Sequence, residues 1–345
     1  MKPKVIKMKK DIRYLAKLAG VSVSTASRAI NNSPGASKET IEKINKLAKK
    51  IGYLPNSVAK SLRSKKTNTI GVILNDIQNP FFSDILWAIN EKLADSNYNT
   101  IISYSNWDLE LERKNILNLL SLKVDGIIIN PIDEKGENIN LVLESGIETV
   151  FLDSYSIYDS ISHTYCDHKR AAFLGADYLL QCGHKDILLI SAIPSSSIFS
   201  RLYIDGYKQA LRNYKIRFKK DLILQLNDTT AENLIKIFKE TITNNEKIFT
   251  SILINSDYLA MFVYIAIREL GLNIPKDLSI VGYDDITICS ALSPPLTTIR
   301  QERKQIGYTS VRILLDNIKP RKRKIVEKVI IQPQLIIRES VRKIL

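Results

Sequence analysis

The stretch DIRYLAKLAGVSVSTASRAIN, residues 11–31, determines what the N-terminal part of this chain forms. It predicts a first helix that ends near Leu18, a tight turn at Ala19-Gly20-Val21, and a second helix over Ser22 to Ile30. Gly20 can adopt the positive φ that such a turn requires. Ala16 lets the helices approach, while Val21, Ala26 and Ile30 hold the second helix against the first. The pattern is typical of a helix-turn-helix.

The outer side of the second helix suits DNA. A recognition helix places side chains on base edges in the major groove and hydroxyls on phosphates. Arg28 can pair with guanine through two hydrogen bonds. The residues expected to contact duplex DNA are Ser22, Val23, Ser24, Thr25, Ser27, Arg28 and Asn31. The alternative is an ordinary helical hairpin that binds no DNA.

The charge distribution favours the DNA-binding interpretation. Residues 1–67 carry 17 Lys and Arg against 3 Asp and Glu, and the rest of the chain carries 33 of each kind, so the whole formal charge of +14 lies in the first fifth. A compact basic segment beside a neutral body indicates nucleic-acid binding, because each cation placed on a phosphate releases counterions. A solvated basic tail is the simpler alternative.

After residue 69 the rhythm changes to short β-rich runs that alternate with amphipathic stretches. Strands are predicted at 69–74, 98–103, 124–129, 148–152, 186–191, 251–254 and 279–283, and helices at 81–95, 110–122, 169–182 and 200–214. This alternation predicts βαβ units with parallel sheets, whose ligand sites lie at the carboxyl ends of the strands.

Several function classes are disfavoured by what the sequence lacks. Cys166, Cys182 and Cys289 are widely spaced, so neither a disulfide framework nor a zinc site is indicated. His163, His168 and His184 are too scattered for a metal or catalytic site, and there is no phosphate-binding glycine motif. No cofactor and no enzymatic activity are expected. No apolar export or membrane segment is visible, so a cytoplasmic protein at the nucleoid is expected.

The chain resembles the LacI/GalR family of bacterial transcriptional regulators. The resemblance starts with the Ala19-Gly20-Val21-Ser22 turn and the Thr25-x-Ser27-Arg28 helix, and it continues through IGYLPNSVAKSL, residues 51–62. Further landmarks are Asn79-Pro80-Phe81-Phe82, Val124-Asp125-Gly126, Gly183-His184, Gly206-Tyr207, the run Val281 to Asp285 and the run Ser293 to Thr298. The resemblance covers nearly the whole chain.

This resemblance implies an all-α helix-turn-helix DNA-binding domain joined to an α/β core that is similar to periplasmic binding proteins. The expected ranges are 1–54 for the DNA-binding domain, 55–68 for a hinge helix and linker, and 69–345 for the effector-binding and dimerisation core. The core would consist of two Rossmann-like subdomains, one of about 69–167 and 300–325, the other of about 168–298 and 326–345. Three crossovers are placed near 167–169, 297–300 and 324–328.

The family pattern also assigns roles to the hinge. It implies that residues 56–61 form a helix on operator binding, and that Leu62 wedges into a minor-groove step and bends the DNA. Lys60 and Arg63 would reach groove edges or phosphates, and Asn56 and Ala59 would also contact DNA. A stray exposed linker leucine is the alternative for Leu62. The segment before Met8 either precedes the translation start or adds phosphate contacts.

The family resemblance also implies effector-binding positions, each assigned to the matching residue of this sequence. Carboxylates at strand ends suit sugar hydroxyls, and an aromatic face covers the apolar side of a pyranose. The predicted set is Asp76, Phe81, Phe82, Asp153, Asp167, Arg201, Tyr203, Thr229, Ser256, Asp284 and Gln301. Each aspartate taken alone is more often a helix cap or loop residue.

Three departures from the family pattern bear on the effector. An arginine that grips the ligand in many relatives is replaced by Tyr203, with Arg201 two residues earlier. Ser256 stands where relatives carry an asparagine, and Thr229 stands where they carry an aromatic residue. The effector therefore need not be that of a familiar relative.

The combined prediction is a repressor of carbohydrate-utilisation genes that binds an inverted-repeat operator as a homodimer and responds to a small sugar or derivative. A dimer is favoured because the chain ends at Leu345 without a leucine-heptad tail. Control by a partner phosphocarrier protein, a cytoplasmic sugar-binding protein, and an enzyme on the same fold are the alternatives. The basic cluster KPRKRK, residues 319–324, is interpreted as a solvated crossover loop in preference to a second nucleic-acid site.

Overall fold

The computed structural model describes residues 11–31, 34–53, 66–192, 197–226, 231–245, 249–319 and 324–344. The chain divides into two compact units, Met1–Thr67 and Asn68–Leu345. Each unit has a hydrophobic core of its own.

The described part of the N-terminal unit holds helices α1 (Ile12–Ala19), α2 (Val23–Ile30) and α3 (Lys38–Ile51). Each helix begins after a polar N-cap whose side-chain oxygen accepts hydrogen bonds from backbone N–H groups of the first turn; these caps are Asp11, Ser22 and Ser37. Helix α1 ends at Gly20, whose φ of 69° is the left-handed conformation that the sequence predicts.

Small side chains let the three helices pack closely. The buried cluster consists of Leu15, Ala16, Ala19, Ala26, Ala29, Ile44 and Ala48. Ala16 and Ala26 therefore hold the helices together as predicted, while Val21 and Ile30 pack at the edge of the cluster. Since most of the cluster is alanine, Leu15 and Ile44 supply much of its buried apolar volume.

Two mostly parallel sheets form the core unit. The first has the order β11-β5-β4-β3-β1-β2, and the second has the order β12-β10-β9-β8-β6-β7. The first sheet consists of β1 (Thr69–Leu74), β2 (Asn99–Tyr104), β3 (Gly126–Ile129), β4 (Thr149–Leu152), β5 (Ser162–Cys166) and β11 (Lys328–Ile331). The second consists of β6 (Ile187–Ser191), β7 (Ile223–Gln225), β8 (Ser251–Ile254), β9 (Ser279–Asp284), β10 (Thr297–Arg300) and β12 (Gln334–Ile336). Only β12 pairs in the antiparallel sense, against β10.

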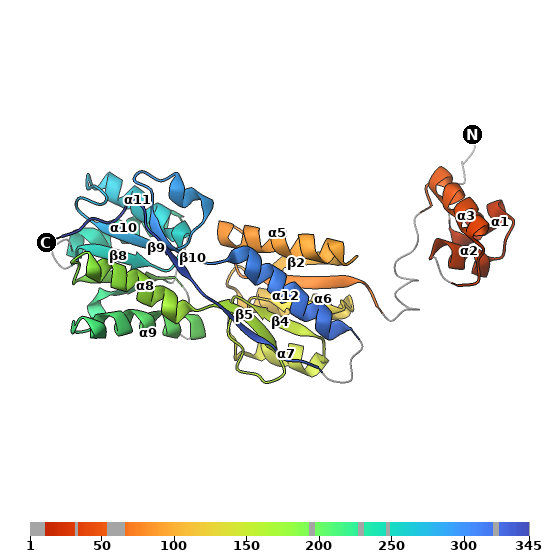
Figure 1. Ribbon diagram of the computed structural model, residues 1–345, viewed down its shortest axis with the longest axis horizontal. Helices are drawn as coiled ribbons and strands as arrows, with labels where there is room; N and C mark the ends of the chain where they lie inside the picture. Colours follow the sequence, from red (N-terminus) through yellow and green to blue (C-terminus); the bar gives the residue numbers. More distant parts are fainter. Residues whose placement is uncertain are drawn as a thin grey trace, which may run out of the picture. The chain divides into compact units, whose positions relative to one another are not determined.

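Helices cover both faces of each sheet (Figure 1). On the first sheet, α5 (Pro80–Asp95) and α12 (Arg303–Ile318) lie side by side, opposite α6 (Leu109–Ser121) and α7 (Glu137–Ser145). On the second, α8 (His168–Gln181) and α9 (Ile198–Asn213) lie opposite α10 (Ala231–Asn245) and α11 (Asp257–Glu269). The predicted fold class is confirmed. No helix of the described residues is long and apolar enough to span a membrane.

Helices α8 and α9 approach closely at one glycine. A Cβ atom on Gly206 would lie 2.0 Å from the carbonyl oxygen of Lys169. Only glycine fits there, which gives the Gly206-Tyr207 pair a structural reason.

The chain passes between the two sheets three times. The first passage, from β5 to α8, lies at Asp167 as predicted. The second, from β10 to α12, follows Arg300 directly. The third was predicted near 324–328, which is wrong: β11 pairs in parallel with β5, so the passage comes after Ile331. Residues 326–331 therefore belong with the first sheet, and β12 is a strand that the sequence analysis did not predict.

Candidate functional site

The face of α2 that was predicted to read DNA is accessible. Ser22, Val23, Ser24 and Arg28 are exposed, whereas Thr25, Ser27 and Asn31 are half-buried. Ala26 and Ala29 on the opposite side are buried against the other helices. The helix therefore presents one polar face with an arginine that has no carboxylate partner among the described residues.

Hydroxyl groups at the start of α2 form a small network. The Ser22 Oγ accepts from the backbone N–H of Thr25 at 3.1 Å and lies 2.8 Å from the hydroxyls of Ser24 and Thr25. The Asn31 amide donates to the Ser27 carbonyl at 2.8 Å and closes the other end of the helix. The first turn thus combines free helix N–H groups with hydroxyls, which suits a phosphate.

The predicted hinge contacts lie outside the described residues. Asn56, Ala59, Lys60, Leu62 and Arg63 all fall within 54–65, and the effector candidate Thr229 falls within 227–230.

A cavity of about 350 Å³ lies between the two sheets of the core. It is lined by residues that follow the carboxyl ends of strands from both sheets, which is where ligand sites occur in open parallel sheets. Seven predicted effector residues line it: Asp76, Phe81, Phe82, Asp153, Ser256, Asp284 and Gln301. The volume lies at the lower end of the range for small-molecule sites.

Burial changes the chemistry of the carboxyl groups in this cavity. The side chain of Asp153 is 9% exposed, and desolvation raises the pKa of its carboxyl group to about 8. Asp284 is also buried, and desolvation, the charge of Asp257 and the charge of Asp153 raise its pKa well above the usual value. Asp153 is therefore largely protonated at neutral pH, and burial disfavours the ionised form of Asp284 as well.

Buried polar atoms without a hydrogen-bond partner lie in the same cavity. The Oδ1 of Asp153, the Oγ of Ser256 and the Oε1 of Gln301 have none among the described residues. A buried polar atom without a partner is costly, so its presence in a cavity indicates a ligand-binding position. The Nε2 of His168, 3.9 Å from Asp153 Oδ1, is unpartnered as well.

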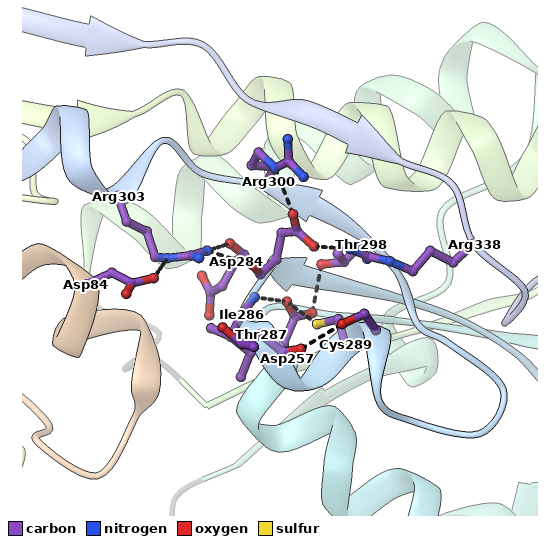
Figure 2. A network of polar contacts seen from close by, with 12 residues as sticks. Asp84, Asp257, Asp284, Ile286, Thr287, Cys289, Thr298, Arg300, Arg303 and Arg338 are labelled. Carbon is purple, nitrogen blue, oxygen red and sulfur yellow. Dashed lines mark hydrogen bonds and ion pairs between the residues drawn. The ribbon is translucent and has the colours of Figure 1, made fainter.

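A network of carboxylates and arginines supports the end of β9 (Figure 2). Asp257 accepts hydrogen bonds from the Thr298 hydroxyl at 2.7 Å, the Cys289 thiol at 3.0 Å and the backbone N–H of Ile286 at 3.2 Å. Asp257 is fully buried, and desolvation raises the pKa of its carboxyl group. These bonds fix the loop that carries Asp284 into the cavity.

The neighbouring Asp285 is held by arginines. Its carboxylate accepts from Arg300 at 2.7 Å and from Arg338 at 2.6 Å. Burial alone would raise the pKa of Asp285, but hydrogen bonds and charges from Arg338 and Arg300 outweigh it, so the pKa is lowered. Asp285 is therefore a structural anion, in contrast to Asp284 next to it.

The described residues hold no cluster of His, Cys, Asp and Glu that fits a metal ion. His184 instead bonds the Thr250 hydroxyl at 2.8 Å and the Arg342 carbonyl at 3.1 Å, which gives it a structural role. The N-terminal unit thus has an exposed helix face that suits DNA, and the core unit has a cavity that suits a small polar ligand.

Two family descriptions match this chain. Residues 11–56 match "Bacterial regulatory proteins, lacI family", and residues 67–339 match "Periplasmic binding proteins and sugar binding domain of LacI family". This chain belongs to the LacI family. It is a DNA-binding transcriptional repressor with a ligand-binding core, and not an enzyme.

Individual relatives of this LacI-family chain agree with that assignment. It is 31% identical to the catabolite control protein A of Priestia megaterium, over 89% of this chain and 92% of that protein. It is 30% identical to the ribose operon repressor of Haemophilus influenzae, over 96% and 98%. Its structure is similar to the lac repressor dimer bound to operator and the anti-inducer ONPF, with a TM-score of 0.82, 28% identity, and coverage of 96% and 99%. It also resembles a LacI-family regulator from Enterococcus faecium with bound ribose, with a TM-score of 0.70, 29% identity, and coverage of 80% and 100%.

Three predicted effector residues of the LacI-family core do not reach the cavity. Asp167 caps α8 by accepting from the backbone N–H of Arg170 at 2.9 Å. Arg201 is exposed on α9. Tyr203 is fully buried, stacks on Phe199, and directs its hydroxyl to a backbone carbonyl. The structure thus places none of the three against a ligand.

Other lining residues were not predicted. They include Asn75, Asn106, Trp107, Asn130, Glu134, Phe199, Asn255, Tyr258 and Tyr283. Asn75 and Asn130 directly follow β1 and β3, so the rule that found Asp153 after β4 would also have found them. Phe199 and Glu134 lie beside loops, and no sequence pattern marked them.

The basic cluster at 319–324 is described only at its two ends. Lys319 pairs with Asp316 at 2.9 Å, and Lys324 pairs with Glu148 at 3.0 Å. Both cations therefore have a carboxylate partner within the core unit, while residues 320–323 lie outside the described residues and the solvated loop stays a prediction.

Proposed function

We propose that this LacI-family repressor controls carbohydrate-utilisation genes by binding an inverted-repeat operator as a homodimer, and that a small sugar or sugar derivative in the cavity regulates it. The observation that carries the proposal is the cavity itself, which is lined by carboxylates, amides and aromatic rings at strand ends of both sheets. Such a lining suits hydroxyl groups and the apolar faces of a sugar ring. The ribose bound to one relative and the ribose operon named for another support a sugar.

The DNA contacts follow from α2. Its first turn lies against phosphates through Ser22, Ser24 and Thr25, and Arg28 reaches a base edge in the major groove. Two copies related by a two-fold axis read two half-sites, so the operator is an inverted repeat. The lac repressor dimer on its operator supports this arrangement. The residues at 56, 59, 60, 62 and 63 add the proposed hinge contacts, and the protein acts at the nucleoid in the cytoplasm.

The effector acts by shifting the relative position of the two subdomains. Asp76, Phe81 and Asp153 come from the first subdomain, while Ser256 and Asp284 come from the second. A ligand that contacts both groups binds one arrangement better than the other. A shift from 1:99 to 99:1 requires about a 10⁴-fold difference in affinity between the two arrangements. Only such a difference changes operator affinity.

Selection from random duplex DNA with the purified full chain tests the proposal. Enrichment of an inverted repeat is the expected result, and the enriched duplex then serves to screen sugars by their effect on binding. If the protein shows only salt-sensitive, sequence-independent binding, whether or not a sugar is present, the proposed binding to an inverted-repeat operator is wrong. If an operator is enriched but no small molecule changes its affinity, control by a partner protein replaces the sugar.

A further inference from the structure

The charges that line the cavity are all of one sign. Four carboxyl groups line it, those of Asp76, Glu134, Asp153 and Asp284, and no Lys or Arg does so in the described part of the chain. Two segments flanked by lining residues, 193–196 and 227–230, contain neither Lys nor Arg in the sequence. A ligand with a phosphate or carboxylate would therefore find no cationic side chain among the described lining residues.

Hydrogen-bond donors near the buried carboxyl groups are already used. The Gln301 Nε2 donates to Asp284 Oδ1 at 2.8 Å, and the Asn130 Nδ2 donates to the Leu152 carbonyl at 2.9 Å. Of the lining atoms left without a partner, the Ser256 hydroxyl can donate or accept, whereas the Gln301 Oε1 is an acceptor and the Asp153 Oδ1 is one once its carboxyl group ionises. The side chains of Gln301 and Asp153 are more than nine-tenths buried. This part of the cavity needs a ligand group that donates hydrogen bonds and does not need to accept them.

Other lining carboxyl groups are already engaged. The Asp76 carboxylate accepts from the backbone N–H of Gln78 at 2.8 Å. The Glu134 carboxylate accepts from the Ser154 hydroxyl at 3.2 Å and from the backbone N–H of Ile198 at 3.5 Å. Asp153 Oδ1 has no such partner, and Asp284 accepts at Oδ1 from the side chain of Gln301, which itself lines the cavity.

We propose that the effector is an aminated sugar, whose ammonium group binds between Asp153 and Asp284 and donates to the Gln301 amide oxygen. An ammonium group has three donors and no acceptor, which matches the unpartnered atoms. Its charge stabilises the ionised form of the buried carboxyl groups, which a neutral hydroxyl cannot do. Aromatic rings of the lining, among them Tyr283 and Phe199, add favourable faces for a cation and for the sugar ring. This inference rests on the proposed function, because it specifies the effector of the same cavity.

Proton release gives the proposal a distinctive signature. In the empty cavity, desolvation raises the pKa of Asp153 to about 8, so the carboxyl group is protonated at pH 7. A bound ammonium lowers that pKa, and the protein then loses a proton. A neutral sugar hydroxyl has no charge with which to cause this loss.

Calorimetric titration of the full-length protein at pH 7 tests the inference. The probes are D-glucosamine, D-galactosamine and D-mannosamine, each compared with its neutral parent sugar, its N-acetyl derivative and its 6-phosphate. We expect at least one amino sugar to bind ten or more times as tightly as its neutral parent, and N-acetylation to remove that gain. Titrations in buffers of different ionisation enthalpy should show proton release with the amino sugar and none with the parent.

Matched variants connect the result to the site. Asp153→Asn should reduce the preference for the amino sugar at least tenfold and abolish the proton release. Asp95→Asn removes an exposed carboxylate at the end of α5 and should leave both unchanged. Operator binding by each variant shows that the protein is folded. A variant at Asp153 that keeps the full preference overturns the inference.

The outcomes separate the inference from the function on which it rests. If a neutral or phosphorylated sugar binds as tightly as the amino sugar, the proposed amino group of the effector is wrong, while regulation by a sugar is retained. If none of these compounds binds a protein that still binds its operator, the amino-sugar effector is rejected.

Discussion

Arg303 donates a hydrogen bond of 2.9 Å to the carboxylate of Asp84, although the two residues lie 219 positions apart in the chain. The same guanidinium group donates to the backbone carbonyls of Asp284 and Asp285 (Figure 2). Arg303 begins α12 and Asp84 lies in α5, both on the first sheet, whereas the two carbonyls end β9 of the second sheet. One side chain thus ties the first subdomain to the strand that carries a cavity carboxylate.

Replacement of Arg303 should destabilise the core more than replacement of its carboxylate partner. Arg303→Gln leaves two carbonyl groups without their donor, so we expect a loss of about 1–3 kcal/mol in the free energy of unfolding. Asp84→Asn removes a partner that is 43% exposed, and solvent screening limits its loss to about 0–1 kcal/mol. Urea unfolding of both variants measures the difference. Equal losses would show that the carbonyl bonds contribute nothing.

The Asp153 carboxyl group should make stability depend on pH in a defined window. Its pKa of about 8 in the folded protein exceeds the value of 3.8 in an unfolded chain, so the folded state holds the extra proton between these values. The contribution of this proton to the free energy of unfolding is complete below pH 4. It is lost as pH rises toward 8, by at most about 1.4 kcal/mol per pH unit.

Comparison with Asp153→Asn isolates that contribution, because the other titrating groups remain. Asparagine also tolerates the φ of 45° found at this position. The stability of the variant relative to the native protein should increase from pH 4 to pH 8, as measured by denaturant unfolding at each pH. A difference that is constant across this range would contradict the raised pKa.

Arg28→Ala should relax sequence specificity. If Arg28 pairs with a base edge, its loss costs about 1–3 kcal/mol in operator affinity and affects random DNA much less. Lys46→Ala removes the same charge from an exposed position on α3, and we expect it to leave the ratio of specific to random affinity unchanged. Binding titrations with operator and random duplexes at one salt concentration decide between these outcomes.

The turn before α2 depends on one backbone conformation. A Cβ atom on Gly20 would meet nothing within 4 Å, so the cost of a side chain there is purely conformational. Gly20→Ala should destabilise the N-terminal unit by about 1–2 kcal/mol, and Gly20→Asn by less, because asparagine adopts a positive φ more readily. Thermal unfolding of the unit and operator affinity should follow that order, while ligand binding by the core stays unchanged.

Seven strands were predicted from β-rich runs, including the partly polar β2, whereas the polar strand β5 was missed. Residues 69–74 and 251–254 form β1 and β8, as their Ile and Leu content indicates. Strand β5, SHTYC, is polar in sequence yet fully buried. Its hydroxyls find partners only in the folded protein, as Thr164 does with the Ser310 hydroxyl 2.5 Å away. Because Thr164 and Ser310 lie 146 positions apart, their pairing leaves no pattern in the local sequence.

The candidate site shows the same contrast between positions that a local sequence pattern marks and positions that depend on tertiary packing. Asp153 and Asp284 were predictable because they follow apolar strands, and parallel strands bring such positions together. Arg201 and Tyr203 could not be placed, because the direction of a side chain on α9 depends on how that helix packs against α8 and on the stack with Phe199. Family resemblance supplied the position of Tyr203, and tertiary packing removed its hydroxyl from the cavity.

The route of the chain between the two sheets sets the order in which the core can be completed on the ribosome. The first sheet lacks its edge strand β11, and α5 lacks its neighbour α12, until most of the second subdomain has been synthesised. Until then the α5 surface around Ile85 and Ala88, which Gly307 later covers at close range, stays open. The helix-turn-helix unit, which emerges first and contains all its own contacts, can fold at once. A nascent chain can therefore hold a finished DNA-reading unit before it has any means of sensing an effector.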